Sequence, residues 1–274
     1  MHVHKLSAAL AALAFAGTAH ATVVIGSASQ VYNQNFDSLA LSGAAVPWAN
    51  DSTLTGWSLF TGAGSAITTY AAGTGSSTTG AFYSFGGSGS AERAFGGLGS
   101  GGAYFGSPAS GAVAGYMAVA LTNSTGAALD GFTVAFDGEQ WRDAGNNPPT
   151  AQTMVLQYGF GATFASVSSW STPGGAFNWT STVNTTTGAA VDGNTAGLVA
   201  GRGGTINTVW NAGDTLWIRW IENNDVGNDA GLAIDNFAFT AGASVVPLPP
   251  ALSLLLSGLG GLGWVGRCRR VARS

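Results

Sequence analysis

Short runs of alternating apolar and polar residues recur through the middle of the chain and predict β-strands. In the clearest run, Gly131–Asp137, the side chains of Phe132, Val134 and Phe136 point to one face and the residues between them to the other. A second run, Thr215–Ile221, is apolar on both faces apart from one arginine. That composition is typical of a central strand in a sheet that is covered on both sides.

The intervening segments are turns rich in glycine and asparagine, and no stretch has the period of about 3.6 residues that marks an amphipathic helix. Six further strands are predicted at Val31–Phe36, Trp57–Phe60, Ala81–Phe85, Gly115–Leu121, Thr153–Phe160 and Leu232–Thr240. Eight strands separated by turns predict an all-β fold, which we expect to be a jelly-roll-like antiparallel β-sandwich.

A glycine- and serine-rich block at Gly86–Gly106 interrupts this pattern. Glycine weakens a strand interior but allows close approach of another backbone. The block is therefore either a long loop or a glycine-rich pair of strands.

Both ends of the chain are apolar and differ from the middle. Met1–Lys5 is a short basic start, Leu6–Gly17 is an apolar core, and residues 19–21 (Ala-His-Ala) fit a small-x-small cleavage site. This order predicts a signal peptide over residues 1–21 and an exported protein that begins at Thr22.

At the other end, prolines precede an apolar run, Ala251–Gly266, which is followed by a basic tail containing Arg267, Arg269 and Arg270. Sixteen residues at a rise of about 1.5 Å cover roughly 24 Å, and the uncharged residues before them extend this length toward that of a bilayer core. We expect a transmembrane helix over 251–266, with the arginines on the cytoplasmic side. The alternative is a buried C-terminal helix or strand, which a cluster of arginines fits poorly.

The order of proline motif, apolar run and arginines resembles the PEP-CTERM sorting signal, the substrate of exosortase in Gram-negative bacteria. The matching motif is Val246, Pro247, Leu248 and Pro249, followed by the leucine- and glycine-rich run and the arginine cluster. The usual motif has glutamate between the two prolines, so the chain resembles the Val-Pro-Leu-Pro variant. The resemblance implies an exosortase-type partner, transient anchoring in the inner membrane, and delivery to the cell surface or beyond.

These features divide the chain into five segments. They are a signal peptide (1–21), a β-sandwich domain (22–243), a proline-containing linker with the sorting motif (244–250), the transmembrane helix (251–266) and a basic cytoplasmic tail (267–274).

Processing changes the chemistry that the exported part can perform. All three histidines lie within residues 1–21, as does the single lysine, and the single cysteine is Cys268. The segment 22–244 therefore has no His, Lys or Cys, which excludes a Ser-His-Asp or Cys-His nucleophile and a zinc site of His/Cys type. It carries four arginines against thirteen carboxylates, a net charge of −9 compared with −4 for the whole chain. This balance argues against nucleic acid as a partner and is compatible with divalent cations and neutral polysaccharide.

Four polar and aromatic motifs in the body weakly resemble secreted bacterial β-sandwich modules of the lectin-like or carbohydrate-binding kind. They lie at residues 35–39, 50–57, 138–142 and 232–237. The resemblance implies a jelly roll and does not imply an activity.

An oxygen-rich loop between two predicted strands is the candidate cation site. Asp225, Asn228 and Asp229 lie in this loop, and Asp235 follows close by in the sequence. Ca²⁺ takes six to eight oxygen ligands, which Asp and Asn side chains and backbone carbonyls supply. The alternative is an ordinary polar turn, since the same residues favour turns.

Candidate ligand contacts follow the clearest strand. Glu139 and Arg142 flank Trp141, and such a group can hold a polar ligand against an aromatic face; alternatively, the two charges form an ion pair beside an inward-facing indole. Trp170 and Trp179 lie in a turn-rich segment and are the tryptophans expected at the surface, where an indole can stack on a sugar ring. Most of the other tryptophans are expected in the core.

Three functions fit these observations. The first is a non-enzymatic, exosortase-sorted protein of the cell surface or extracellular matrix, whose sandwich binds polysaccharide. The second is a glycan-binding module stabilised by Ca²⁺. The third is a secreted glycoside hydrolase, which needs two paired carboxylates. The three glutamates (Glu92, Glu139 and Glu222) are far apart in the sequence, so nothing in the chain points to such a pair.

Overall fold

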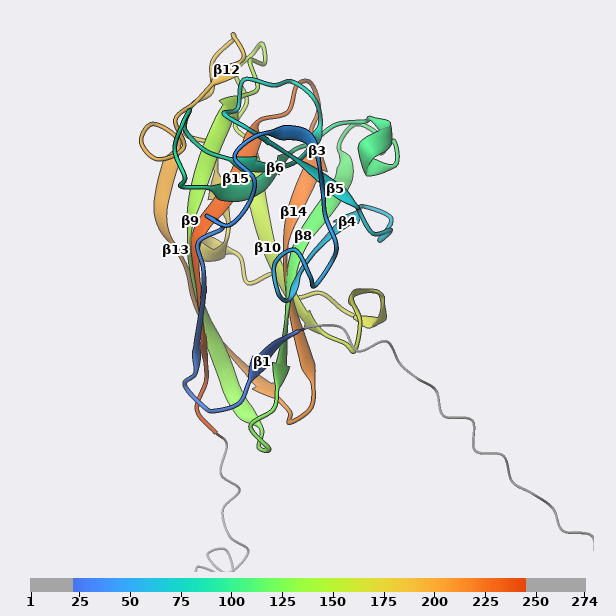
Figure 1. Ribbon diagram of the computed structural model, residues 1–274, viewed down its shortest axis with the longest axis vertical. Helices are drawn as coiled ribbons and strands as arrows, with labels where there is room; N and C mark the ends of the chain where they lie inside the picture. The colour runs from blue at the N-terminus through green and yellow to red at the C-terminus, as the bar shows by residue number, and fades with distance from the viewer. Residues whose placement is uncertain (1–21, 245–274) are drawn as a thin grey trace, which may run out of the picture.

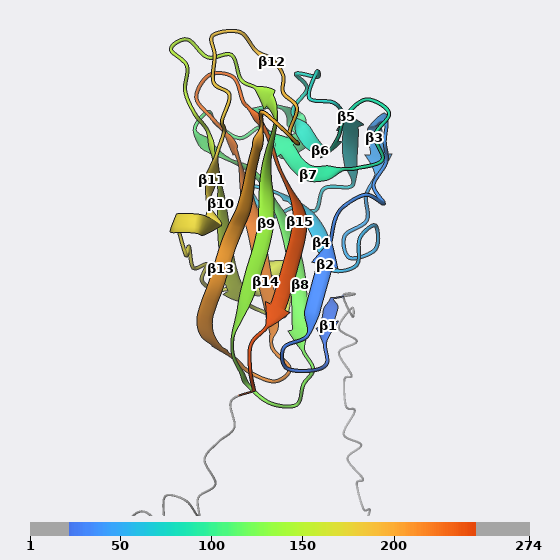
Figure 2. The same cartoon turned by 90° about the vertical axis from the view of Figure 1, so that its left-hand side faces the viewer.

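A computed structural model of the chain describes residues 22–244, which form an all-β, sandwich-like fold of two sheets (Figures 1 and 2). The six-stranded sheet has the order β1-β8-β14-β10-β11, with β4 also paired to β8. Its strands are β1 (Val23–Ile25), β4 (Trp57–Thr61), β8 (Ala112–Asn123), β10 (Thr153–Phe160), β11 (Trp179–Thr180) and β14 (Thr215–Asn224).

The nine-stranded sheet has the order β12-β9-β15-β7-β6-β5-β3, with β13 also paired to β9 and β2 to β15. Its strands are β2 (Val31–Gln34), β3 (Gly43–Pro47), β5 (Thr69–Gly73), β6 (Ala81–Phe85), β7 (Ala94–Leu98), β9 (Leu129–Asp143), β12 (Ala189–Ala190), β13 (Leu198–Trp210) and β15 (Gly231–Ala241). Three short 3₁₀ turns complete the fold: η1 (Ala103–Phe105), η2 (Phe164–Ser166) and η3 (Gly175–Phe177).

The predicted strands are confirmed, and most of them are longer than their sequence pattern indicated. All eight predicted runs overlap an observed strand, and the run Thr153–Phe160 coincides with β10. The expected inward face of β9 is also confirmed, because Phe132, Val134 and Phe136 are all buried. The expectation of a purely antiparallel sandwich is wrong in two places, since β1 pairs with β8 and β5 pairs with β6 in parallel.

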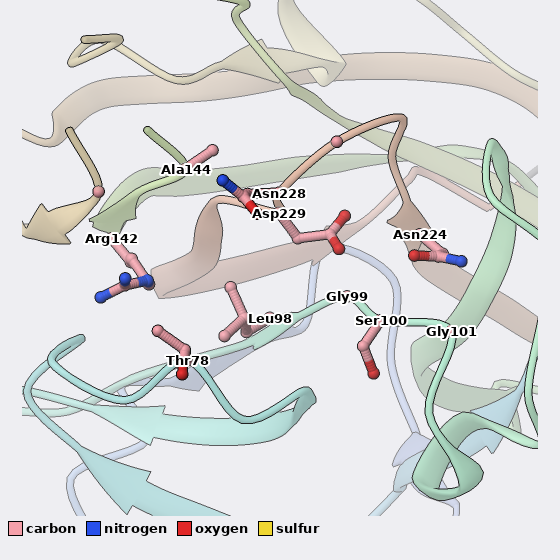
Figure 3. A pocket seen from close by; sticks show the side chains of 12 residues that line it. Thr78, Leu98, Gly99, Ser100, Gly101, Arg142, Ala144, Asn224, Asn228 and Asp229 are labelled. Atoms are coloured by element: carbon pink, nitrogen blue, oxygen red, sulfur yellow. The ribbon is translucent and has the colours of Figure 1, made fainter. Parts of the chain in front are cut away.

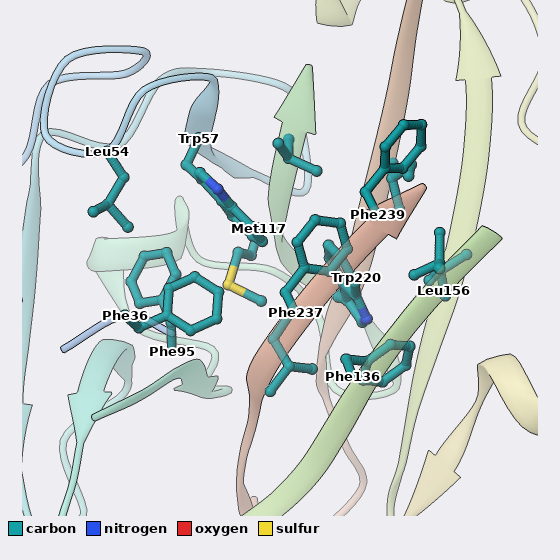
Figure 4. Close-up of a cluster of buried hydrophobic side chains, with 14 of the residues drawn as sticks. Phe36, Leu54, Trp57, Phe95, Met117, Phe136, Leu156, Trp220, Phe237 and Phe239 are labelled. Carbon is teal, nitrogen blue, oxygen red and sulfur yellow. The ribbon is translucent and has the colours of Figure 1, made fainter. Parts of the chain in front are cut away.

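Aromatic side chains from both sheets fill the space between them (Figure 4). The indole rings of Trp57 and Trp220 stack with centroids 5.8 Å apart and an interplanar angle of 15°. Phe237 of β15 meets both indoles edge-on, at 5.4 and 5.5 Å. Without a disulfide in the described residues, burial of these large rings supplies much of the driving force for folding.

Trp217 lies on the opposite face of β14 from Trp220, as its position three residues away predicts. It packs under the 3₁₀ turn η2 with Phe164, in a small cluster on the outer face of the six-stranded sheet. Arg219 projects to the same side and lies 3.7 Å from the ring centroid of Trp170. Each face of this sheet therefore has its own aromatic cluster.

The glycine-rich block contains both a strand and loops. Its strand, β7, runs antiparallel to β6 on one side and to β15 on the other. A Cβ atom at Gly96 would overlap the backbone of Leu232 and Ala233, so β7 approaches β15 too closely for any larger residue. Gly96 is thus required for the packing of β7 against β15.

The strands β14 and β15 connect two poles of the sandwich. The loop between them, residues 225–230, lies at one pole, whereas β15 ends at the other, where Ser244 forms an isolated bridge with Leu129 (Figure 1). We call these the loop pole and the tail pole. The predicted signal peptide (1–21), the sorting motif and predicted membrane helix (both within 245–266), and the basic tail (267–274) lie outside the described residues. Within residues 22–244, no helix has the length and apolar character needed to cross a membrane.

Candidate functional site

A groove of about 430 Å³ opens at the loop pole, where β7, β9 and β14 end (Figure 3). Because these three strands from the two sheets end at the same pole, the segments that follow them surround one space. The groove is lined by Thr78, Leu98, Gly99, Ser100, Gly101, Arg142, Ala144, Gly188, Asn224, Gly227, Asn228 and Asp229.

Glycine backbone forms part of the groove wall. A Cβ atom at Gly99 would overlap the carbonyl oxygen of Asn223, so the chain after β7 runs directly against the end of β14. Gly227 has a φ of +98°, which favours glycine, and a Cβ there would lie 2.5 Å from Oδ1 of Asn146. A larger side chain at either position would overlap the neighbouring segment of the wall.

Polar side chains project from the walls and are held by hydrogen bonds. Arg142 donates through Nη1 to the carbonyl oxygens of Gly75 (3.1 Å) and Ser76 (3.3 Å). Asn224 donates through Nδ2 to the carbonyl of Pro108 at 3.0 Å. These contacts orient the two side chains before any ligand binds, which lowers the entropic cost of recognition.

Burial changes the protonation of the carboxyl groups behind the groove. Partial burial raises the pKa of Asp229 to about 7. The hydrogen bond from the backbone N–H of Asp225 opposes this shift, and the charge of Asp225 adds to it by a smaller amount. Complete burial raises the pKa of Glu222 well above its usual range, and Asp229 and Asp225 add to the effect. Burial therefore favours the protonated form of Glu222 beneath the groove.

The structure brings together only part of the predicted calcium site. Oδ1 of Asp229 accepts a hydrogen bond from the backbone N–H of Asp225 at 2.6 Å. The carbonyl oxygen of Asn228 accepts from Asn146 (2.9 Å) and from Gln152 (2.7 Å). These two oxygens are thus engaged with the protein, as they would be in a polar turn, and the calcium site at this loop stays a prediction.

Asp235 lies elsewhere. It follows Gly231 by four residues along β15, which carries it about 13 Å away from the loop. There it joins Glu92 and Glu139, and one carboxylate oxygen from each of the three residues lies within 4.8 Å of the others. This carboxylate cluster is on the outer face of the nine-stranded sheet.

The predicted ligand contacts are separated by the fold. Arg142 lines the groove, but Glu139 and Trp141 are buried, and Nε1 of Trp141 donates to Oε2 of Glu139 at 2.9 Å. The anticipated partnership of Glu139 with Arg142 is therefore replaced by separate hydrogen bonds. Of the two tryptophans expected at the surface, Trp170 is half-buried against Arg219.

The expectation that Trp179 is exposed is wrong. Its side chain is 2% exposed, because the indole packs over Gly138, where any Cβ would overlap the ring. The sequence around Trp179 is rich in turns and does not show that Gly138, on the facing strand, leaves space for the indole ring.

No local sequence pattern marked several of the groove residues, or one member of the carboxylate cluster, as candidates for a functional site. Thr78 and Ser100 lie in loop segments that resemble many others in this chain. Glu92 is separated from Glu139 and Asp235 by 47 and 143 residues, respectively, and only the order of neighbouring strands β9-β15-β7 brings them together. The one available hint was the glycine-rich segment, which marks close backbone approach.

Comparisons with known proteins do not assign a family to the chain. No protein-family model matches it, and a search of curated proteins finds no match.

Proposed function

We propose that the protein is an exported, non-catalytic β-sandwich of the cell surface or extracellular matrix that binds a neutral polysaccharide in the groove at the loop pole. The proposal includes delivery by an exosortase-type enzyme through the Val246–Pro249 motif, and a jelly-roll form of the sandwich. Support for delivery comes from the sequence of the two ends, and support for binding comes from the groove.

The main support for a non-catalytic function is the small number of carboxyl groups in the groove. Among the residues that line it, only Asp229 has a carboxyl side chain. Glycoside hydrolysis by the usual route needs a general acid and a second carboxylate about 5–10 Å apart on either side of the scissile bond. Glu222 does not supply the second group, because it is fully buried behind Gly97 and Gly99. The lining of the groove therefore supports binding without cleavage.

The polar character of the groove supports a neutral sugar as the ligand. Arg142 and Asn224 present hydrogen-bond donors, and Asp229 presents an acceptor. Sugar hydroxyls both donate and accept, so they match such a mixed surface. The net charge of −9 between residues 22 and 244 disfavours an anionic polymer.

Binding is tested with the full-length protein in detergent micelles on an array of neutral and acidic glycans. The Arg142→Ala variant is expected to weaken binding of the best neutral glycan by about tenfold or more, because it removes an oriented donor. Asp214→Asn, at the end of the sandwich away from the groove, is the matched control and is expected to bind like the wild type. Equal affinity for Arg142→Ala and wild type contradicts the groove as the binding site.

The hydrolase alternative is tested on the same material. Release of reducing ends from the bound glycan, with loss of that activity in Asp229→Asn, would establish catalysis and overturn the non-catalytic assignment. We expect no release of reducing ends by the wild-type protein.

Sorting is tested in a Gram-negative host that expresses exosortase, by cell fractionation of the full-length chain. Replacing Arg267, Arg269 and Arg270 with alanine is expected to reduce delivery to the surface. The Leu248→Glu variant, which restores the usual residue between the prolines, is expected to change the extent of sorting. Unchanged delivery in both variants contradicts a role for the motif.

A further inference from the structure

We propose that Glu92, Glu139 and Asp235 form a calcium site on the outer face of the nine-stranded sheet, separate from the groove and from the loop at residues 225–229. It is a structural site that joins three neighbouring strands.

The sheet topology places these side chains together. In the register of β9 and β15, Glu139 lies opposite Ala233, so Asp235 is its diagonal neighbour on the same face. Glu92 precedes β7, which pairs with the other edge of β15. One carboxylate from each of three adjacent elements therefore meets at one point.

A local irregularity directs Asp235 into the cluster. The pairing of β15 with β9 shifts after Asp235, and the next residue, Asn236, has a φ of +51°. This conformation is uncommon for a residue other than glycine, and bulges of this kind often re-aim a side chain. Asn236 donates to Oδ2 of Asp137 at 3.0 Å, which holds the bulge in place.

Two oxygens in the cluster are buried without a hydrogen-bond partner. They are Oδ1 of Asp235, whose side chain is 4% exposed, and Oε1 of Glu92. Two other carboxyl oxygens have side-chain donors: Nε1 of Trp141 donates to Oε2 of Glu139, and Nδ2 of Asn194 donates to Oε2 of Glu92 at 2.7 Å. A buried carboxylate oxygen without a partner is costly, and a bound cation removes that cost.

Arg93 interacts with Glu92 through its charge, but its hydrogen bonds go to other groups. Arg93 adjoins Glu92 in the sequence, but its guanidinium donates to the hydroxyl and carbonyl oxygens of Ser84 and to the carbonyl of Gly73. Its backbone N–H donates to Asp37. The acidic groups that surround the cluster, Asp37 and Asp137, add further negative charge.

The chemistry and spacing fit Ca²⁺. The three ligands are carboxylates, and the described residues contain no histidine or cysteine, which the softer transition metals prefer. Calcium–oxygen distances are about 2.3–2.6 Å, so two oxygens on one ion are at most about 5 Å apart. The observed limit of 4.8 Å lies within this range. Mg²⁺ dehydrates reluctantly and usually keeps several waters, so it suits a set of three protein carboxylates less well.

Calcium binding is tested by titrating CaCl₂ into EDTA-treated full-length protein in detergent micelles, with calorimetry and melting curves. The wild type is expected to bind one ion at this site and to melt at a higher temperature. Asp235→Asn and Glu92→Gln are expected to weaken binding by at least about tenfold, because each removes a charged ligand. Exposed Asp130→Asn is the control for loss of one charge and is expected to bind like the wild type.

Asp229→Asn separates this site from the loop at the loop pole. Retained binding in Asp229→Asn with loss in Asp235→Asn supports the carboxylate cluster. The reverse pattern overturns the proposal and assigns the ion to the loop. The absence of both heat and a melting shift in the wild type also overturns it, and this result does not depend on whether any variant folds. Glu92 is only partly buried, so Glu92→Gln serves if Asp235→Asn does not fold.

Discussion

Burial governs the behaviour of individual carboxyl groups in this protein. Desolvation raises the pKa of Glu139 to about 8 and that of Asp235 to about 7, with additional effects from Glu92 and Asp137. Hydrogen bonds from Trp141 and from the backbone of Asn236 oppose these shifts but are outweighed. In the absence of a cation, these two groups therefore favour the protonated form near neutral pH.

The stability of the protein in EDTA is expected to depend on pH through these two carboxyl groups. A carboxyl group whose pKa is higher in the native state than in the unfolded state stabilises the protein below the unfolded pKa, and that stability is lost as the pH rises through the native value. The unfolded values are near 4 and the native values near 7 and 8, so the free energy of unfolding is expected to fall between about pH 4 and pH 8. Urea unfolding of the full-length protein at several pH values measures this loss.

The Glu139→Gln variant is expected to show a smaller decrease, because glutamine does not ionise. At pH 8 in EDTA it should be more stable than the wild type by on the order of 2 kcal/mol. Exposed Asp130→Asn is the control and should follow the wild-type curve. A parallel decrease in the wild type and Glu139→Gln would show that another group is responsible.

At the scale of elements, the close contact between β7 and β15 restricts the sequence of β7. Gly96→Ala is expected to destabilise the protein by about 2 kcal/mol or more, because its Cβ would overlap backbone that cannot move independently. Gly87→Ala, in the loop before β7, is the control: its Cβ would lie 3.7 Å from Ser90, an ordinary contact. Urea unfolding of both variants measures the difference, and equal stability would contradict the required close approach.

The elements differ in how far the sequence predicts them. Strands that are buried on one face, such as β9, show a clear alternation of apolar and polar residues, and the sequence predicted them. The long strand β13 was missed, because it lies at a sheet edge, most of its side chains are at least partly exposed, and its glycines at 201, 203 and 204 interrupt the pattern. An edge strand has little apolar burial to impose a period of two.

The candidate sites were predictable only where their residues are close in sequence. The loop at Asp225–Asp229 was identified, and it forms one wall of the groove. The carboxylate cluster was not identified, although Glu139 was singled out as a ligand contact and Asp235 as a calcium ligand beside the loop. Its formation depends on strand order and on the bulge after Asp235, and neither leaves a local pattern in the sequence.

For the molecule as a whole, the two sheets bury more than one layer of apolar side chains. The main core lies between them, while Trp141, Phe85 and Tyr83 form a second cluster on the outer face of the nine-stranded sheet. The carboxylate cluster borders this second layer, through the hydrogen bond from Trp141 to Glu139. The outer face of the sheet is thus an ordered part of the structure and supports a site of its own.

The separation of the two poles has a mechanical consequence. A polymer held in the groove and an attachment beyond Ser244 would pull on opposite ends of β15, in a direction parallel to the strand. Since hydrogen bonds between antiparallel strands are perpendicular to them, this force loads many bonds in shear at once, instead of opening them one by one. β15 is paired along both edges, so tension applied through its end is shared with β9, β2 and β7.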